Sequence, residues 1–256
     1  MSCLKFLSEN LYNTAQVSLT VGTVNAQFPL ANLKNESPSV KFRSIESTCV
    51  ILVDLLQTRD FDSFALAGSP TEQLNIISAE IKTSTTTDFT MSTAIPIDLS
   101  SSELIGFKFF TEVSKRYVQV TLVSSVFCEV SQIFIGKSLE LEQIALSIDS
   151  FSYQRSDQSS KSLNRYGQVF IDKLNQIKSL GGSIEFANKD EQEDLDDMFI
   201  RHGETLPIWM IVDTDNESMN DGKFKLTIYG YIQEMPTWSA VGGQLYNASI
   251  SVKQAI

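Results

Sequence analysis

The sequence offers a single imidazole for acid–base chemistry, because His202 is its only histidine. His202 stands at the end of an expected helix and directly before Gly203, where an imidazole caps the last helix carbonyls and faces the negative end of the helix dipole. We favour that structural role over a general base. The sequence also lacks the Gly-x-Ser-x-Gly motif of a serine nucleophile and both glycine-rich motifs that bind phosphates. We therefore expect no enzyme, no catalytic residue, no cofactor-binding residue and no cofactor.

The segment Asp213-Thr-Asp-Asn-Glu217 begins like a calcium-binding loop. Such a loop needs glycine at its sixth position and a bidentate glutamate at its twelfth, and these positions hold Ser218 and Phe224. A hairpin-like loop over residues 213–222 is the simpler interpretation. We therefore predict no metal site here.

The three cysteines, Cys3, Cys49 and Cys128, do not have the spacing of metal ligands. Cys49 and Cys128 both lie in apolar segments that resemble strands, where a free thiol behaves as a small buried hydrophobic group. A bridge between these two residues is possible, and the sequence leaves the question open.

The composition is that of a folded protein, with 42% hydrophobic and 20% charged residues among 256. Twenty basic against 31 acidic residues give a net charge of −11, which argues against a nucleic-acid partner. Residues 1–10 lack the apolar core of a signal peptide, and no segment is long and apolar enough to span a membrane. We expect the chain to be made in a cytoplasm-like compartment, without membrane insertion.

The first half reads as a series of short strands without alternating helices, which favours a jelly-roll-like β-sandwich over residues 1–140. Cys49 to Val53 is a continuous apolar run, and we expect a strand buried on both faces and closed by Asp54. A polar turn over residues 57–60 then leads to a second core strand that pairs with it and ends at Gly68. We expect Asp54 to bind nearby backbone or an arginine such as Arg59. The other expected strands are Val17–Val21, Val40–Ile45, Leu104–Phe110, Tyr117–Val123 and Val126–Ile135, while Leu74–Lys82 is ambiguous between helix and strand.

The strand rhythm restarts after a boundary near residues 136–142, which predicts a second domain over residues 141–256. One helix is expected from Asp190 to His202, capped by Asn188 and Glu191 and packed through an apolar stripe that includes Leu195. Its acidic face is taken as solvated. The polar run Arg155–Ser162 is either a mobile loop or an arm. The expected strands are Phe151–Arg155, Gln168–Leu174, Ser183–Phe186, Ile208–Asp213, Phe224–Gln233 and Tyr246–Val252.

Two tryptophans have different expected roles. Trp209 lies in an apolar strand just after the helix and is predicted to be a core residue. Trp238 lies in a turn-rich segment, and a satellite core and an interface anchor are equally good interpretations.

Motifs in the first half resemble a known family. Phe28-Pro-Leu-Ala-Asn-Leu33, Val50 to Leu55 and Phe64-Ala-Leu-Ala-Gly68 resemble the galactose-binding-like, discoidin-type jelly roll. Lys115 to Thr121 and Gln132-Ile-Phe-Ile-Gly136 look like the version of that domain found in tailed-phage virion proteins. The sequence departs from the family at Leu56, where glycine is frequent.

The second half resembles the β-sandwich of distal-tail and tail-tip proteins. The matching segments are Tyr166 to Asp172, the helix end at His202-Gly203, Leu206 to Met210, Leu226 to Gly230 and a last strand around Tyr246. The resemblance implies a bacteriophage structural protein of the tail tip or baseplate, found in the virion tail and in the host cytoplasm during assembly. It implies a ring homo-oligomer, with six subunits as one option, that contacts the tail tube and the tail hub. The expected interface residues are Arg155, Ser156, Asp157, Trp238 and Tyr246.

The alternative function is a carbohydrate-binding module that recognises host-surface glycans. A sugar site needs exposed aromatic rings beside polar side chains, and the nearest candidates in the first half are Tyr12, Phe89 and Tyr117. A hydrolase is the weakest of the three interpretations because the chain has one histidine.

Overall fold

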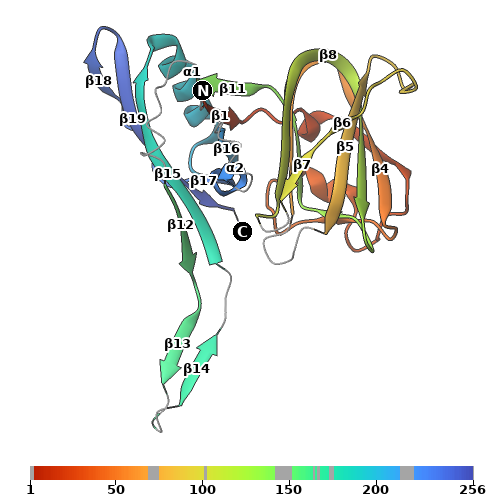
Figure 1. The fold of residues 1–256 in the computed structure, drawn as a ribbon, viewed down its shortest axis with the longest axis horizontal. Coiled ribbons are helices and arrows are strands. Elements are labelled where there is room, and N and C mark those ends of the chain that lie inside the picture. The colour runs from red at the N-terminus through yellow and green to blue at the C-terminus, as the bar shows by residue number, and fades with distance from the viewer. Residues whose placement is uncertain are drawn as a thin grey trace. The chain divides into compact units, whose positions relative to one another are not determined.

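The computed structural model describes residues 3–68, 75–100, 103–141, 152–163, 165, 168–172, 176–213 and 222–255. The chain divides into two compact units (Figure 1), and each is considered by itself. The N-terminal unit is Phe6–Leu139, and the C-terminal unit contains residues 3–5 together with Glu140–Ala255. The first residues of the expected 1–140 domain thus belong to the other unit. The predicted fold class, mainly β with β-sandwich sheets and one long helix near residues 190–202, is confirmed.

The N-terminal unit consists of short strands, two long strands and two 3-10 helices. They are η1 (Leu11–Thr14), β2 (Gln16–Val21), η2 (Leu30–Lys34), β3 (Phe42–Arg43), β4 (Thr48–Ala67), β5 (Ile76–Ser84), β6 (Ile95–Pro96), β7 (Asp98–Ser100), β8 (Ile105–Ser124), β9 (Glu129–Val130) and β10 (Gln132–Gly136). The ambiguous segment Leu74–Lys82 therefore contains a strand, β5.

The long strands β4 and β8 build both layers of the N-terminal unit. They run antiparallel from Thr48 opposite Val123 to Ala67 opposite Ile105, and their register shifts in the middle. In the first pairing segment, from Thr48 to Asp54 of β4, the sheet is extended by β2 on β4 and by β5 on β8. In the second, from Ser63 to Ala67 of β4, it is extended by β10 on β4 and by β7 on β8. Figure 1 shows β8 curving from one layer into the other. Bulges bend strands in this way, so one sheet folds over its own apolar face.

The prediction of two core strands joined by a turn is wrong. The two apolar runs are halves of β4; they do not pair with each other, and both pair with β8. The first half is also buried on one face only, since Cys49, Ile51 and Val53 are buried while the residues between them are partly exposed. A bulge within one strand and a polar turn between two strands both place polar residues between two apolar runs. The sequence pattern therefore does not distinguish one bent strand from two strands.

The bend lies at Leu56, whose φ of 67° is in the left-handed region that favours glycine. The Asp54 carboxylate stabilises it by accepting a hydrogen bond from the Leu56 N–H at 2.8 Å. Asp54 also accepts two hydrogen bonds from Arg116, at 2.8 and 2.9 Å, which lower the pKa of Asp54. The expectation that Asp54 binds backbone or an arginine holds, but the arginine is Arg116 on the neighbouring strand β8 and not Arg59.

Cys49 and Cys128 are free buried thiols, so the bridge that the sequence left open is not formed in this structure. The Cys128 Sγ lies 3.3 Å from the carbonyl oxygens of both Ser47 and Leu122, which share its single S–H as acceptors. The hydrogen bond between the two thiols raises the pKa of Cys49 and lowers that of Cys128.

The C-terminal unit contains an eight-stranded sheet, a two-stranded ribbon and two helices. Its elements are β1 (Cys3–Leu7), β11 (Ser138–Leu141), β12 (Ser152–Asp157), β13 (Ser160–Leu163), β14 (Val169–Asp172), β15 (Gln176–Ala187), α1 (Lys189–His202), β16 (Ile208–Asp213), α2 (Gly222–Lys225), β17 (Thr227–Ile232), β18 (Ser239–Gly242) and β19 (Leu245–Gln254). The sheet order is β11-β1-β16-β17-β19-β15-β12, with β18 on β19. The predicted loop over residues 213–222 falls mainly on residues 214–221, which lie outside the described residues.

Helix α1 begins at Lys189, one residue before the predicted start, and ends at His202 as predicted. Asn188 and Glu191 form a reciprocal capping box, with both hydrogen bonds at 2.9 Å. Gly203 ends the helix with a φ of 56°. Leu195 and Phe199 are buried members of its apolar stripe.

Trp209 on β16 is a core residue as predicted, with 2% of its surface exposed. Its ring lies 5.0 Å from that of Tyr229 on β17, at an interplanar angle of 37°. The two aromatic residues are directly opposite in the strand register. This cross-strand contact therefore stabilises the pairing of β16 with β17 at the centre of the C-terminal sheet.

Candidate functional site

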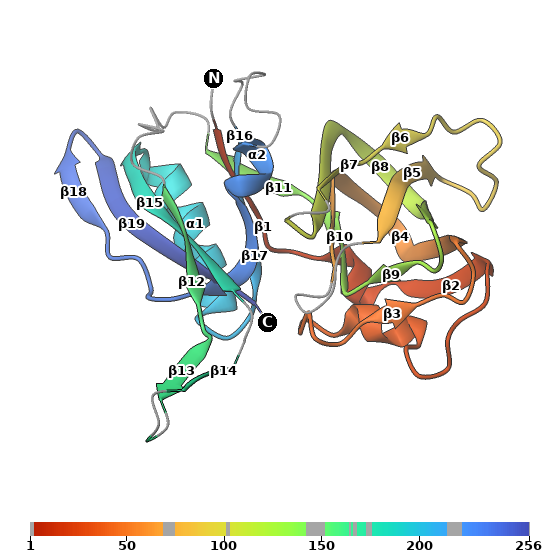
Figure 2. The same ribbon diagram turned by 60° about the horizontal axis from the view of Figure 1, so that its bottom comes forward.

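An extended arm, residues 152–172, is the most exposed part of the C-terminal unit. Its base is the pairing of β12 with β15, which ends where Asp157 lies opposite Gln176. Beyond this pair the chain continues as the ribbon β13–β14. Figures 1 and 2 both show this ribbon projecting beyond the eight-stranded sheet. Every described arm residue is exposed except Ser159, which is intermediate.

The arm carries large apolar side chains despite its exposure. The exposed fractions are 72% for Leu163, 58% for Val169, 56% for Phe170 and 61% for Ile171. A two-stranded hairpin is at best marginally stable in water without a further layer against its apolar side chains. Clusters of exposed apolar residues mark interaction surfaces. The arm is therefore the best candidate for a protein-binding element.

The predicted interface residues lie on two strands, β12 and β19, and in the loop before β18. Arg155, Ser156 and Asp157 are exposed on β12 at the base of the arm. Trp238 is partly buried, and its indole N–H donates to Asp196 of α1 at 3.2 Å. Tyr246 is partly buried on β19, opposite Ala187 and Ala240. Their role in an interface stays a prediction.

Sequence reasoning did not identify Leu163, Val169, Phe170 and Ile171 as exposed. The sequence predicts a strand over Gln168–Leu174 but does not say which side of it is exposed. The available signal was its neighbourhood, because apolar strand residues beside a long polar run are poorly placed to reach a core.

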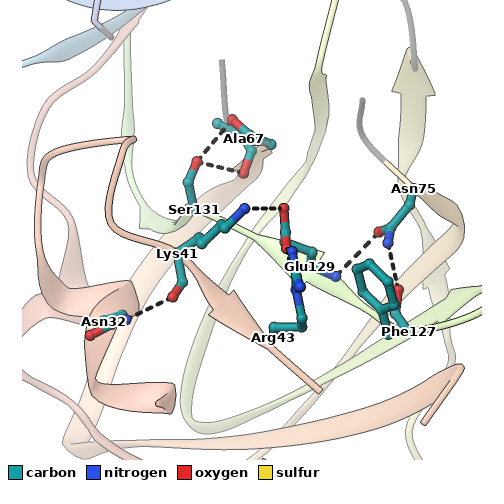
Figure 3. A network of polar contacts seen from close by, with 9 residues as sticks. Asn32, Lys41, Arg43, Ala67, Asn75, Phe127, Glu129 and Ser131 are labelled. Carbon is teal, nitrogen blue, oxygen red and sulfur yellow. Dashed lines mark hydrogen bonds and ion pairs between the residues drawn. The ribbon is translucent and has the colours of Figure 1, made fainter. Parts of the chain in front are cut away.

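A network of polar contacts ties the loops of the N-terminal unit to its sheet (Figure 3). At its centre, Glu129 is 4% exposed and lies between two cations. Lys41 contacts Glu129 Oε1 at 3.1 Å, and Arg43 contacts Oε2 through Nε at 2.6 Å and Nη2 at 2.5 Å. The Arg43 guanidinium also lies over the rings of Phe28 and Phe127, at 4.7 and 4.4 Å.

The rest of the network uses backbone groups. Asn75 donates to the Phe127 carbonyl at 2.6 Å and accepts from the Glu129 N–H at 3.2 Å. Asn32 donates to the Lys41 carbonyl at 2.7 Å, and the Ser131 hydroxyl donates to the carbonyl of Ala67 at 3.0 Å. Because these polar groups engage one another, the network anchors loops of the N-terminal unit to its sheet.

A hollow of about 470 Å³ lies at the bend of the N-terminal unit. Hydroxyl side chains dominate its lining, which comprises Thr83, Ser84, Thr85, Thr86, Asp88, Met91, Ser92, Thr93, Ile95 and Lys115. Two of the aromatic residues predicted as sugar-site candidates neighbour lining residues, one in sequence and one by strand pairing. Phe89 follows Asp88, and Tyr117 pairs with Ser84. The third, Tyr12, is fully buried, so its proposal as a sugar-stacking residue is wrong.

His202 lies in the last turn of α1, as predicted, but its imidazole does not cap helix carbonyls. The imidazole ring donates a hydrogen bond to the backbone carbonyl of Pro207. Its buried Nδ1 has no hydrogen-bond partner among the described residues. Burial, and to a smaller extent the charge of Arg201, lowers the pKa of His202.

The described residues contain no group of three or more His, Cys, Asp or Glu side chains that is arranged to hold a metal ion. Within the same residues, no helix has the length and apolarity that crossing a membrane requires.

No family model matches this sequence, and no curated protein matches it either. Several solved structures resemble about half of the chain. The lectin domain of lectinolysin, complexed with Lewis B antigen, is 14% identical over 51% of this chain and 98% of its own, with a TM-score of 0.44. The family 32 carbohydrate-binding module of Clostridium perfringens NanJ, in complex with galactose, is 11% identical over 52% and 99%, with a TM-score of 0.42.

A Streptococcus pneumoniae fucose-binding module is 12% identical over 50% of this chain and 96% of its own, with a TM-score of 0.41. All three are sugar-binding modules, and none of the three is a phage tail protein. The tail-tip role that the sequence motifs imply stays a prediction.

Proposed function

We propose that this chain is a structural subunit that assembles with other protein chains through its extended arm, as its sequence resemblance to tail-tip and baseplate proteins implies. The observation that carries the proposal is the ribbon β13–β14, whose apolar side chains remain more than half exposed. Ordering an isolated ribbon costs conformational entropy that so few contacts within the ribbon do not offset. Contact with a partner supplies the missing layer.

The arm offers a direct test because it can be removed without breaking the main sheet. Asp157 and Gln176 are the last paired residues at its base, so a two-residue Asn-Gly turn in place of residues 158–175 closes a short hairpin there. We expect this variant to keep the thermal stability of the natural chain and to be lost from assembled particles. The measurement is mass spectrometry of phage particles purified from a producing culture.

The matched control is substitution of Ser160 and Ser162 by threonine, which keeps the ribbon and favours extended backbone. This control is expected to enter particles at the natural level. Absence of the natural chain from the particles, or equal incorporation of the shortened variant, would contradict the proposal.

A second candidate function is sugar binding at the hollow beside the bend of the N-terminal unit. The observation that favours it is the lining, since hydroxyl groups both donate and accept hydrogen bonds and Lys115 adds a charged donor. Phe89 and Tyr117, both partly exposed, are the nearest rings for stacking against a sugar face.

The sugar-binding candidate predicts that the full chain binds neutral glycans on an array and that Lys115→Ala with Thr86→Ala reduces this binding at least about tenfold, as losing a binding hot spot does. Lys108→Ala is the control, because Lys108 lies on the same strand but outside the lining. Glycan binding that survives the Lys115 and Thr86 substitutions would place the site elsewhere, and no binding at all would remove this candidate.

A further inference from the structure

The two faces of the ribbon β13–β14 differ in character. The register places Leu163 opposite Val169 and Lys161 opposite Ile171, so these four side chains share one face. We call Lys161, Leu163, Val169 and Ile171 the ribbon face. It presents three apolar side chains and one cation, whereas the opposite face has Phe170 across from Ser162.

The outward side of α1 has the complementary character. Glu193, Asp197 and Ile200 are spaced by four and three residues, so they form one stripe along the helix. All three are exposed, Ile200 to 70%. We call these three residues the α1 outer stripe. It presents two carboxylates followed by one large apolar side chain, and Glu193 also forms an exposed ion pair with Lys189 at 3.4 Å.

The charge distribution favours contact between two copies of the chain. The arm, residues 152–172, carries three basic and two acidic side chains, while the whole chain has a net charge of −11. Two acidic copies repel each other over most of their surfaces, and the arm is a segment of opposite sign. An arm that meets an acidic surface therefore lowers the electrostatic free energy of association.

We propose that the ribbon face of one copy docks on the α1 outer stripe of a second copy. The apolar ribbon side chains cover Ile200, and Lys161 lies against Glu193 and Asp197. The contact uses different surfaces on the two partners, so it is heterologous, and repetition closes a ring or extends a chain of subunits. This inference rests on the proposed function, since it names the partner of the same arm.

The test measures the mass of the full chain in solution by light scattering over a dilution series. We expect the natural chain to exceed the 28.5 kDa of one copy. Leu163→Ser with Ile171→Ser, and separately Glu193→Lys with Asp197→Lys, should each raise the dissociation constant at least about tenfold, as expected for central interface residues. Ser160→Thr with Ser162→Thr is the matched control on the opposite ribbon face, outside the exposed apolar side chains, and should leave the mass unchanged.

Circular dichroism and thermal melting show whether each variant is folded, and a folded variant that loses mass supports the contact. A natural chain that remains at the mass of one copy overturns the inference, as does an equal loss in the Ser160 and Ser162 control or no loss in the α1 double variant. If the chain alone is monomeric but still enters particles through its arm, this inference fails while the proposed function stands.

Discussion

Replacing Glu129 with alanine is expected to lower the free energy of unfolding of the N-terminal unit by about 3–5 kcal/mol. The carboxylate is 4% exposed and is the shared partner of Lys41 and Arg43, whose side chains are 10% and 22% exposed. Removing it leaves two poorly hydrated cations close together. Two like charges in a site of low polarity repel each other, and the carboxylate that offset their lost hydration is gone.

The measurement is chemical denaturation followed by hydrogen–deuterium exchange mass spectrometry, which assigns the loss to one unit. Asp98→Ala is the control, because Asp98 forms an ion pair with Lys108 at 3.4 Å and both side chains are at least one-third exposed. That variant should lose about 0–1 kcal/mol. Similar losses in both variants would mean that the Glu129 network does not anchor the unit.

Replacing Trp209 with alanine is expected to lower the free energy of unfolding of the C-terminal unit by about 3–5 kcal/mol. The side chain is buried to 98% or more and stacks against Tyr229 in the centre of the sheet. Alanine leaves a cavity between β16 and its neighbours, because strands held by a backbone ladder cannot collapse fully around it. Exchange protection should fall in β16 and β17 and stay unchanged in the N-terminal unit.

Trp209→Phe separates packing from other effects, since it keeps an aromatic ring and should cost less than the alanine variant. Leu206→Ala is an exposed control in the same region, where 39% of the leucine is accessible, and it should change stability little. A loss below about 1 kcal/mol in Trp209→Ala would show that the core closes around the gap.

The sequence predicts local structure best where one physical signal dominates. Helix α1 was located to within one residue because its capping box, apolar stripe and terminal glycine agree. The core role of Trp209 follows from an apolar strand around it. The bend in β4 does not follow from the apolar pattern. A bulge at Leu56 changes only the local backbone, and the apolar runs before and after it look the same as two separate strands.

The arm shows a different limit. Its polar run was recognised as an arm or a loop, but Leu163, Val169 and Ile171 have the apolar, β-branched character of buried strands. Burial depends on what else reaches the same place in the fold, and that information is not local. The Glu129 network has the same limit, since it joins residues 88 and 86 positions apart.

Strand β1 is synthesised long before the C-terminal sheet that contains it can be completed. It lies between β11 and β16 in the C-terminal sheet, although about two hundred residues separate it from β16 along the chain. A ribosome adds roughly 5–20 residues per second, so β1 emerges about 10–40 seconds before β16 exists. The N-terminal unit can fold during that interval, whereas β1 has only β11 as a strand partner and leaves the backbone groups of its β16 side in water. In a nascent chain arrested before residue 208, the N-terminal unit should therefore be protected, and the backbone N–H groups of β1 that pair with β16 should be unprotected.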